Sequence, residues 1–181
     1  MDRIEETIEL FLEEFRPPSQ RMEIASEDLQ GLHEHWQTFL SEVGVCQRHD
    51  GYLWIINPAD FTWVTPLFDL DVVPVARDSF GNFFCTNPQG HLYSFLPHNR
   101  QLDLMAEDVL SAIGFLGEKE FTDDEELLRL HNKYVKGGRN TGYDTCYCLK
   151  PAIPLGGAFG GSEVHIGQIR DYLEMLALAT R

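Results

Sequence analysis

Short apolar runs separated by turn residues fill residues 45–96, and this pattern constrains the fold more than any other feature of the chain. Val45–Arg48 and Tyr52–Asn57 flank His49-Asp50-Gly51, and an Asp-Gly step between two apolar runs favours a tight hairpin. Further runs follow at Val72–Arg77, Asn82–Thr86 and His91–Leu96. Their connections are only a few residues long, whereas a parallel crossover needs about a dozen residues. The sequence therefore predicts an antiparallel meander.

Segments with helical periodicity lie on both sides of this meander. Apolar residues three and four apart predict helices over residues 2–15, 27–42, 102–116, 123–135 and 169–179, the first with Ile4, Ile8, Phe11, Leu12 and Phe15 on its core face. A short helix is expected after Asn57–Pro58, another strand at Thr145–Leu149, and a loop over Pro151–Gly161. We expect an α+β fold, in which an antiparallel β-meander packs against N- and C-terminal helices in a single compact body.

The charge of the chain limits the partners that it can bind. Its 181 residues are 43% hydrophobic, which is enough for a core, and its formal net charge is -15. Such a surface repels nucleic acid and anionic membranes, and it attracts basic proteins. Acidity of this size also keeps a protein in solution, so charge alone does not establish a partner. The acidic, amphipathic start of the chain is unlike a secretory signal, and we expect a cytoplasmic location.

Metal and cofactor sites are not expected. Cys146 and Cys148 are one residue apart, whereas structural zinc sites use wider spacings and a second ligand pair, so the four cysteines are interpreted as reduced, buried thiols. His33 and His35 fall inside a predicted helix, where residues two apart diverge by about 200°. The glycine-rich run Gly156–Gly161 lacks the Gly-Lys-Ser/Thr ending of a phosphate loop.

Catalytic residues are not expected either. The Gly-x-Ser-x-Gly motif of many hydrolases is absent from the sequence. None of the seven histidines lies in a recognisable nucleophile motif with a cysteine or serine. We therefore interpret the chain as a binding protein rather than an enzyme.

Ordered short motifs in both halves of the chain resemble a known protein family. The first half contains Phe15-Arg16-Pro17-Pro18, Trp36, Gly51-Tyr52-Leu53-Trp54-Ile55-Ile56-Asn57-Pro58 and Ala76-Arg77-Asp78-Ser79-Phe80-Gly81-Asn82. These residues resemble the GAD-like domain. The second half contains Gly142-Tyr143-Asp144-Thr145-Cys146-Tyr147, Pro151-Ala152, Leu155-Gly156-Gly157 and a terminal helix. It resembles the companion C-terminal domain of bacterial immunity proteins. The resemblance implies a GAD-like domain over 1–100 and an immunity-type domain over 101–181, packed against it.

This resemblance implies a type VI secretion immunity protein, which binds and neutralises a cognate secreted toxin in bacterial competition. Some such toxins are DNases, and a nuclease needs basic groups to hold phosphates, so an acidic inhibitor could cover its active site. The family is not known to be enzymatic, so the resemblance supplies no catalytic residue. The candidate interface combines aromatic anchors with acidic side chains. It comprises Asp50, Tyr52, Trp54, Asp78, Phe80, Asp123, Asp124, Glu125 and Glu126.

Two other functions stay open at this stage. One is a small hydrolase that uses Cys146 or a histidine, which requires a pocket with a Cys–His or carboxylate pair within hydrogen-bond reach. The other is a ligand-sensing regulatory module without a toxin partner. The acidic run Asp123–Glu126 could bind a basic protein or a cation, but it also fits the positive end of a helix dipole.

Overall fold

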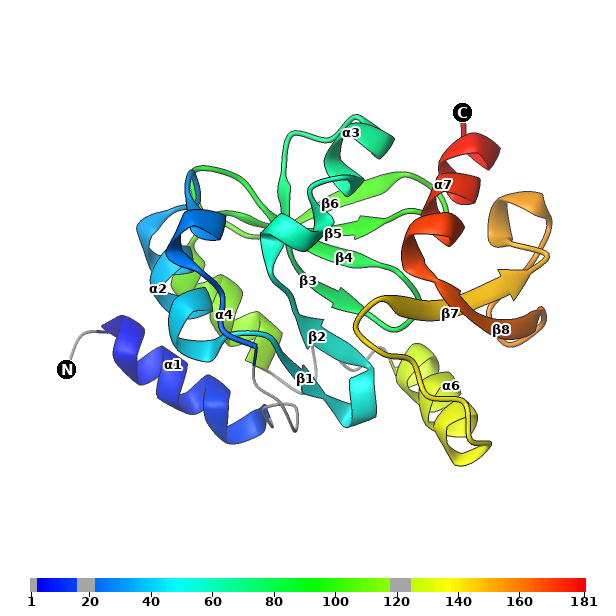
Figure 1. Ribbon diagram of the computed structural model, residues 1–181, viewed down its shortest axis with the longest axis horizontal. Coiled ribbons are helices and arrows are strands. Elements are labelled where there is room, and N and C mark those ends of the chain that lie inside the picture. The colour runs from blue at the N-terminus through cyan, green and yellow to red at the C-terminus, as the bar shows by residue number, and fades with distance from the viewer. Residues whose placement is uncertain (1–2, 16–21, 118–124) are drawn as a thin grey trace.

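A six-stranded antiparallel sheet forms the centre of the computed structural model, which describes residues 3–15, 22–117 and 125–181 (Figure 1). Each strand pairs with its neighbours in the chain, in the order β1-β2-β3-β4-β5-β6, so the predicted meander is confirmed. The strands are β1 Cys46–Arg48, β2 Leu53–Ile55, β3 Val73–Asp78, β4 Phe83–Thr86, β5 Leu92–Leu96 and β6 Gln101–Ala106. A second, two-stranded antiparallel sheet joins β7 Thr145–Lys150 to β8 Glu163–Gln168.

The predicted Asp-Gly turn closes the first hairpin. His49, Asp50 and Gly51 all have positive φ angles, of 50°, 54° and 90°, a conformation that Asp tolerates and that Gly adopts without strain. At Gly51 a Cβ atom would also lie 3.2 Å from the carbonyl oxygen of Thr141. The turn therefore fixes the β1–β2 register and brings residues far apart in the chain into contact.

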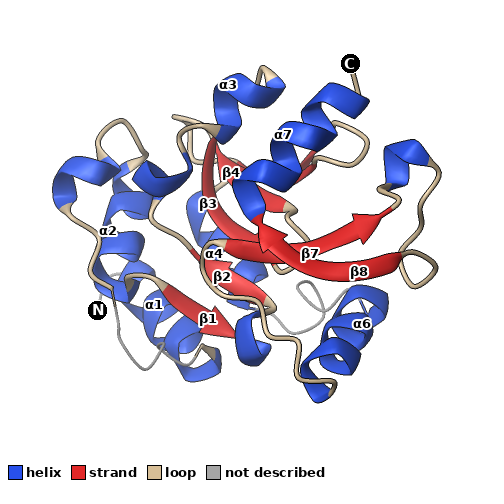
Figure 2. Cartoon of the chain, turned by 45° about the vertical axis from the view of Figure 1, so that its right-hand side comes forward, coloured by secondary structure: helices blue, strands red, loops and turns tan. Residues whose placement is uncertain are grey.

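Helices gather at the two ends of the sheet (Figure 1). At one end lie α1 Arg3–Glu14, α2 Glu34–Val43 and α4 Val109–Gly117; at the other lie α6 Glu125–Lys136 and α7 Ile169–Ala179, while the short α3 spans Val64–Phe68. In Figure 2 the β7–β8 ribbon lies between α7 and α6. Among the described residues, no helix combines the length and the apolar character that a membrane crossing requires. These N- and C-terminal helices around a meander are the expected α+β architecture.

Aromatic side chains dominate the core between α1, α2 and the sheet. The rings of Phe11 and Phe15 stack with centroids 4.1 Å apart, and Phe39 of α2 meets Phe11 edge-on at 4.8 Å. Trp36 is fully buried, and its indole N–H donates to the carbonyl oxygen of Gly90 at 3.3 Å. Edge-on pairs and a satisfied indole are the arrangements that large aromatic residues favour inside proteins. The amphipathic pattern of the first helix is thus confirmed for four of its five core positions, since Leu12 is 42% exposed.

The predicted helix over 27–42 is wrong in its first half. A 3-10 turn at Ser26–Leu29 is followed by Gly31, whose φ of 88° ends helical geometry. His33 then caps α2, because its Nδ1 accepts a hydrogen bond from the backbone N–H of His35 at 3.2 Å. The two rings lie 5.2 Å apart, centroid to centroid, and do not diverge as two positions inside one helix would.

Two strands were missed by the sequence analysis. Residues 101–106 form β6, although the sequence predicts a helix from residue 102. The pairing of β6 with β5 sets Phe95 opposite Leu102 and Ser94 opposite Asp103. The sheet therefore continues across residue 100, the predicted boundary between two domains, and α4 beyond it packs on α1. The division into domains stays a prediction. The β8 strand, also not predicted, follows the loop that begins at Pro151.

A buried arginine connects the meander to the C-terminal region. Arg77 on β3 is fully buried, and its guanidinium donates hydrogen bonds to the carbonyl oxygens of Gly142, Tyr143 and Asp78. Its charged group also lies over the ring of Trp54, 5.8 Å from the centroid. The backbone N–H of Tyr147 on β7 donates to the carbonyl of Ser79 at 2.8 Å. These contacts position β7 against the turn between β3 and β4.

Candidate functional site

The aromatic residues predicted at the interface are part of the core. Tyr52, Trp54 and Phe80 are each at least nine-tenths buried. Tyr52 meets the ring of His131 on α6 at 5.5 Å, and Phe80 meets Tyr147 at 5.2 Å. The indole N–H of Trp54 donates to the carbonyl of Gly51 at 3.1 Å. In this structure all three hold the meander against the C-terminal region and present almost no surface to a partner.

Asp78 is also buried, and it organises the turn between β3 and β4. Its carboxylate accepts hydrogen bonds from the backbone N–H groups of Phe80 and Asn82 and from the side-chain amide of Asn82, at 2.7–3.0 Å. Burial nevertheless raises the pKa of Asp78 to about 6, because removing a carboxylate from water outweighs these bonds and the nearby Arg77. The structure therefore gives Asp78 a role in the fold rather than at the surface.

Of the predicted acidic positions, Asp50 and Glu126 lie at the surface. Asp50 is exposed in the β1–β2 turn, and Glu126 is exposed in the first turn of α6. Asp123 and Asp124 lie outside the described residues, as does the side chain of Glu125, so the predicted acidic run is described only at its end. The described members of the predicted set are thus divided between the core and the surface.

An acidic face on α1, which the sequence analysis did not single out, lies at the opposite end of the molecule from α6 (Figure 1). Glu5, Glu6, Glu9 and Glu13 are exposed there, together with Leu10 at 61% and Leu12 at 42%. At about 100° per residue, the four glutamates lie between Leu12 and Leu10 around the helix. We call these six residues the α1 face. Its two exposed leucines flank the row of glutamates, one on each side.

Among the described residues of the first 117, exposed basic side chains barely compensate this charge. No lysine precedes Lys119 in the sequence. Of the Lys and Arg residues in the described part of 3–117, Arg3 alone is exposed, because Arg48 and Arg77 are buried and Arg100 is half-buried. Many acids are exposed over the same range, including Glu23, Glu27, Glu34, Glu42, Asp69, Asp71, Asp103, Glu107 and Asp108. The described part of the surface around the meander therefore exposes far more acids than bases.

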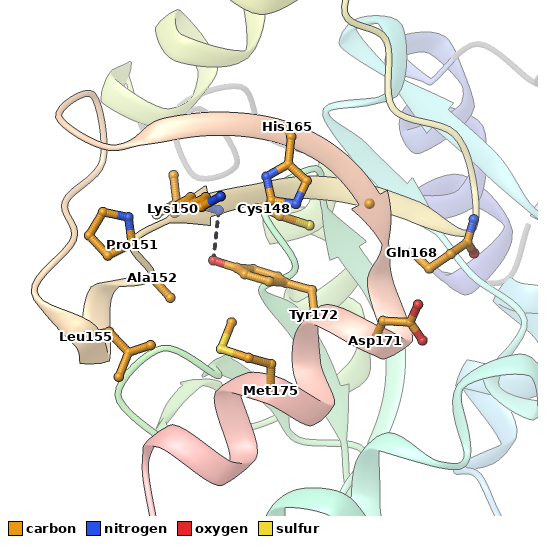
Figure 3. A pocket seen from close by; sticks show the side chains of 12 residues that line it. Cys148, Lys150, Pro151, Ala152, Leu155, His165, Gln168, Asp171, Tyr172 and Met175 are labelled. Atoms are coloured by element: carbon orange, nitrogen blue, oxygen red, sulfur yellow. Dashed lines mark hydrogen bonds between the residues drawn. The ribbon is translucent and has the colours of Figure 1, made fainter.

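The C-terminal region has a mixed surface and contains a sizeable cleft. Arg129, Lys133 and Lys136 are exposed on α6. Between the β7–β8 ribbon and α7 lies a cleft of about 430 Å³ (Figure 3), whose lining includes Cys148, Lys150, His165, Asp171, Tyr172 and Met175. The volume is within the range of small-molecule sites.

A smaller cavity of about 200 Å³ lies where the β5–β6 turn meets α6. His98 on its wall is buried, and desolvation lowers the pKa of this histidine to about 4, so the imidazole is neutral at physiological pH. Within the described ranges, no group of three or more His, Cys, Asp or Glu side chains is arranged to hold a metal ion.

Cys146, the nucleophile of the alternative hydrolase hypothesis, is fully buried beside Cys148. The pKa of Cys146 is raised well above its ordinary value, first by its hydrogen bond with Cys148 and then by burial. A thiol with a raised pKa is a poor nucleophile at neutral pH, because the thiolate is the reactive form. This environment does not favour Cys146 as a hydrolytic nucleophile.

Comparison with known proteins shows the fold alone. No known protein family matches the sequence, and no curated protein matches it. The chain is similar to a solved structure, that of Atu4351 from Agrobacterium tumefaciens, with a TM-score of 0.75 and 16% sequence identity, over 93% of this chain and 87% of that one. The two proteins thus share nearly their whole architecture.

Proposed function

We propose that this protein is a cytoplasmic immunity protein that binds a cognate type VI secretion toxin with a basic surface and neutralises it by covering its active site. The observation that carries this proposal is the nearly uncompensated negative surface of the described residues within 3–117, of whose Lys and Arg side chains Arg3 alone is exposed. The resemblance of the sequence motifs to immunity proteins names the kind of partner.

Electrostatic complementarity explains how such a protein would find its target. A DNase active site needs Lys and Arg to hold phosphates, so its surface attracts a protein with a charge of -15. The attraction acts over about 10 Å at 0.1 M salt and raises the association rate more than the final affinity. An inhibitor of this kind competes with nucleic acid for the same basic groups.

The α1 face supplies the apolar contacts that charge alone does not provide. Binding energy concentrates in side chains that become fully desolvated at the centre of an interface, while charges at the rim contribute mainly to the rate of association. Leu10 and Leu12 are exposed beside Glu5, Glu9 and Glu13. They replace the buried Tyr52, Trp54 and Phe80 as anchor residues in the proposed interface.

Isothermal titration with a catalytically inactive form of the toxin encoded next to this gene tests the proposal. We expect a stoichiometric complex, and rescue of growth when the active toxin is co-expressed with this protein. Exchanging Glu5, Glu9 and Glu13 for Lys should weaken both the binding of the toxin and the rescue of growth. A matched control exchanges three exposed acids of the C-terminal region, Asp144, Glu163 and Glu174, and should leave both intact. Absence of a complex together with absence of rescue would contradict the proposal.

The cleft beside α7 favours a ligand-sensing module as a second candidate function. Its volume of about 430 Å³ and its mixture of apolar and charged lining are typical of a small-molecule site. This candidate predicts that a small ligand raises the melting temperature of the protein while no toxin binds. The titration described above therefore separates the two functions.

A further inference from the structure

Two thiols lie side by side on β7. Cys146 and Cys148 are two residues apart on the strand, so their side chains project to the same face of the ribbon. Their sulfur atoms are 3.9 Å apart, and neither forms a disulfide. Two residues apart on a strand, the Cα atoms are separated by about 6.6 Å, near the upper limit that a disulfide spans. Bringing the sulfurs to bonding distance therefore requires a local shift of the β7 backbone as well as a rotation of the side chains.

The structure leaves room for the sulfur of Cys148 on the neighbouring strand. A Cβ atom at Gly167 of β8 would lie 2.8 Å from that sulfur. The φ angle of Gly167 is not positive, so the backbone conformation does not require glycine there. The absence of a side chain at position 167 makes space for Cys148, and the backbone N–H of Gly167 contributes to lowering the pKa of the Cys148 thiol.

The two thiols differ in the way that a reactive pair requires. The pKa of Cys148 is lowered, first by the hydrogen bond from Cys146 and then by the Gly167 N–H, against the effect of burial. The pKa of Cys146 is raised well above its ordinary value. Cys148 lines the cleft with 3% of its surface exposed, and Cys146 is fully buried beside it. The thiol that faces the cleft is therefore the better nucleophile, and its neighbour is placed to react second.

The charged residues of the cleft lie on opposite sides of Tyr172. Figure 3 shows Lys150 on one side of that ring and Asp171 on the other, and both side chains are exposed. The apolar lining between them includes Met175. A small molecule with a carboxylate at one end, an ammonium group at the other and an uncharged middle matches this arrangement, because each charge meets its opposite.

We propose that Cys146 and Cys148 form a thiol–disulfide exchange site whose substrate is a low-molecular-weight, zwitterionic disulfide bound in the cleft. The Cys148 thiolate attacks one sulfur of the substrate disulfide, R–S–S–R. The substrate S–S bond breaks, a mixed disulfide forms on Cys148, and the first R–S⁻ leaves and takes up the proton that Cys148 has lost. Cys146 then attacks the Cys148 sulfur and gives its proton to the second departing R–S⁻. Two protein thiols are oxidised, and one disulfide is reduced to two thiols.

Oxidised glutathione is a suitable probe, with intact-mass spectrometry and peptide mapping of the native protein as the readout. We expect the wild-type chain to lose two hydrogen atoms and to carry a Cys146–Cys148 disulfide. Cys46 and Cys85 act as internal controls, because they are buried like Cys146 and Cys148 but do not line the cleft, and burial raises the pKa of Cys85. Cys148 should react at least about 10-fold faster than Cys85.

Two serine variants separate the steps. Cys146→Ser should keep one glutathione on Cys148, because the second attack is removed. Cys148→Ser should stay unmodified on the same timescale, and the double variant Cys46→Ser/Cys85→Ser should react like the wild type. The mapping of the wild type does not depend on whether these variants fold. Equal reaction at all four cysteines, or no reaction unless the protein is unfolded, would overturn the proposal.

Discussion

The meander with its N-terminal helices and the C-terminal region from α6 to α7 share one core but have different surfaces. Residues 3–117 expose many acids and, among the described Lys and Arg side chains, Arg3 alone. Residues 125–181 expose both signs of charge and form the cleft beside Cys148. Electrostatic attraction and ligand binding thus reside in different parts of one chain. Long-range attraction to a partner needs only an excess of one charge at the surface, whereas binding a small molecule needs a concave site.

The largest expected effect concerns Arg77, which joins the two regions. Arg77→Met removes hydrogen bonds to the buried carbonyl oxygens of Gly142 and Tyr143. We expect a loss of about 3–5 kcal/mol in the free energy of unfolding, measured by urea titration. Arg170→Met is the control, because Arg170 makes an exposed i,i+4 ion pair with Glu174 that contributes less than about 0.5 kcal/mol. Equal effects of both changes would show that Arg77 does not join the regions.

A pH titration of stability tests the turn beside that junction. The folded pKa of Asp78, about 6, lies above its ordinary value of 3.8. Ionisation of Asp78 therefore lowers the free energy of unfolding. Protonated Asp78 contributes up to about 3 kcal/mol to the free energy of unfolding. This contribution is complete below pH 3.8 and is lost as the pH rises through 6. We expect the difference in unfolding free energy between wild type and Asp78→Asn to change over this window. A difference that stays constant between pH 4 and 7 would contradict the account of Asp78.

Gly167→Ala tests the close packing within the C-terminal region. The new Cβ would lie 2.8 Å from the Cys148 sulfur, and such crowding costs about 1–3 kcal/mol. Adding Cys148→Ala removes the obstructing sulfur and should restore a good part of that loss. A double-mutant cycle by urea unfolding measures this coupling. A coupling energy near zero would mean that the sulfur does not limit position 167.

The smallest energetic effect is expected at the α1 face. Exchanging Glu5, Glu9 and Glu13 for Lys should leave the unfolding free energy nearly unchanged, because all three are exposed. The same change should lower the association rate with the toxin about 10-fold at low salt, and the loss should shrink as salt screens the charges. Stopped-flow kinetics would measure the association rate at each salt concentration. An identical loss from Asp144, Glu163 and Glu174 exchanged for Lys would instead show that only net charge matters.

Local signals made the meander predictable. The turn at Asp50-Gly51 and the short connections between apolar runs specify antiparallel neighbours without knowledge of the rest of the chain. The β6 strand was missed because Leu102 and Leu104 fit both a strand and the helix that follows, and only pairing with β5 decides between them. The β8 strand depends in the same way on β7, a partner distant in the sequence.

The candidate interface was harder to predict, because the local sequence around an aromatic residue does not distinguish an anchor for a partner from a core residue. Tyr52, Trp54 and Phe80 are buried through contacts with α6, β7 and their own turn, none of which is visible in their local sequence. A signal for the acidic surface was present, since no lysine precedes Lys119. Whether this absence of lysine leaves the surface acidic depends on the burial of Arg48 and Arg77, which only the structure provides.

Hydrogen–deuterium exchange of the protein with and without its toxin tests the central proposal most directly. The account predicts that the toxin protects peptides from the acidic surface of residues 3–117, with the strongest protection at Arg3–Glu14, and leaves α6 to α7 unchanged. Protection confined to residues 125–181, or no protection at toxin concentrations that saturate binding, would contradict it.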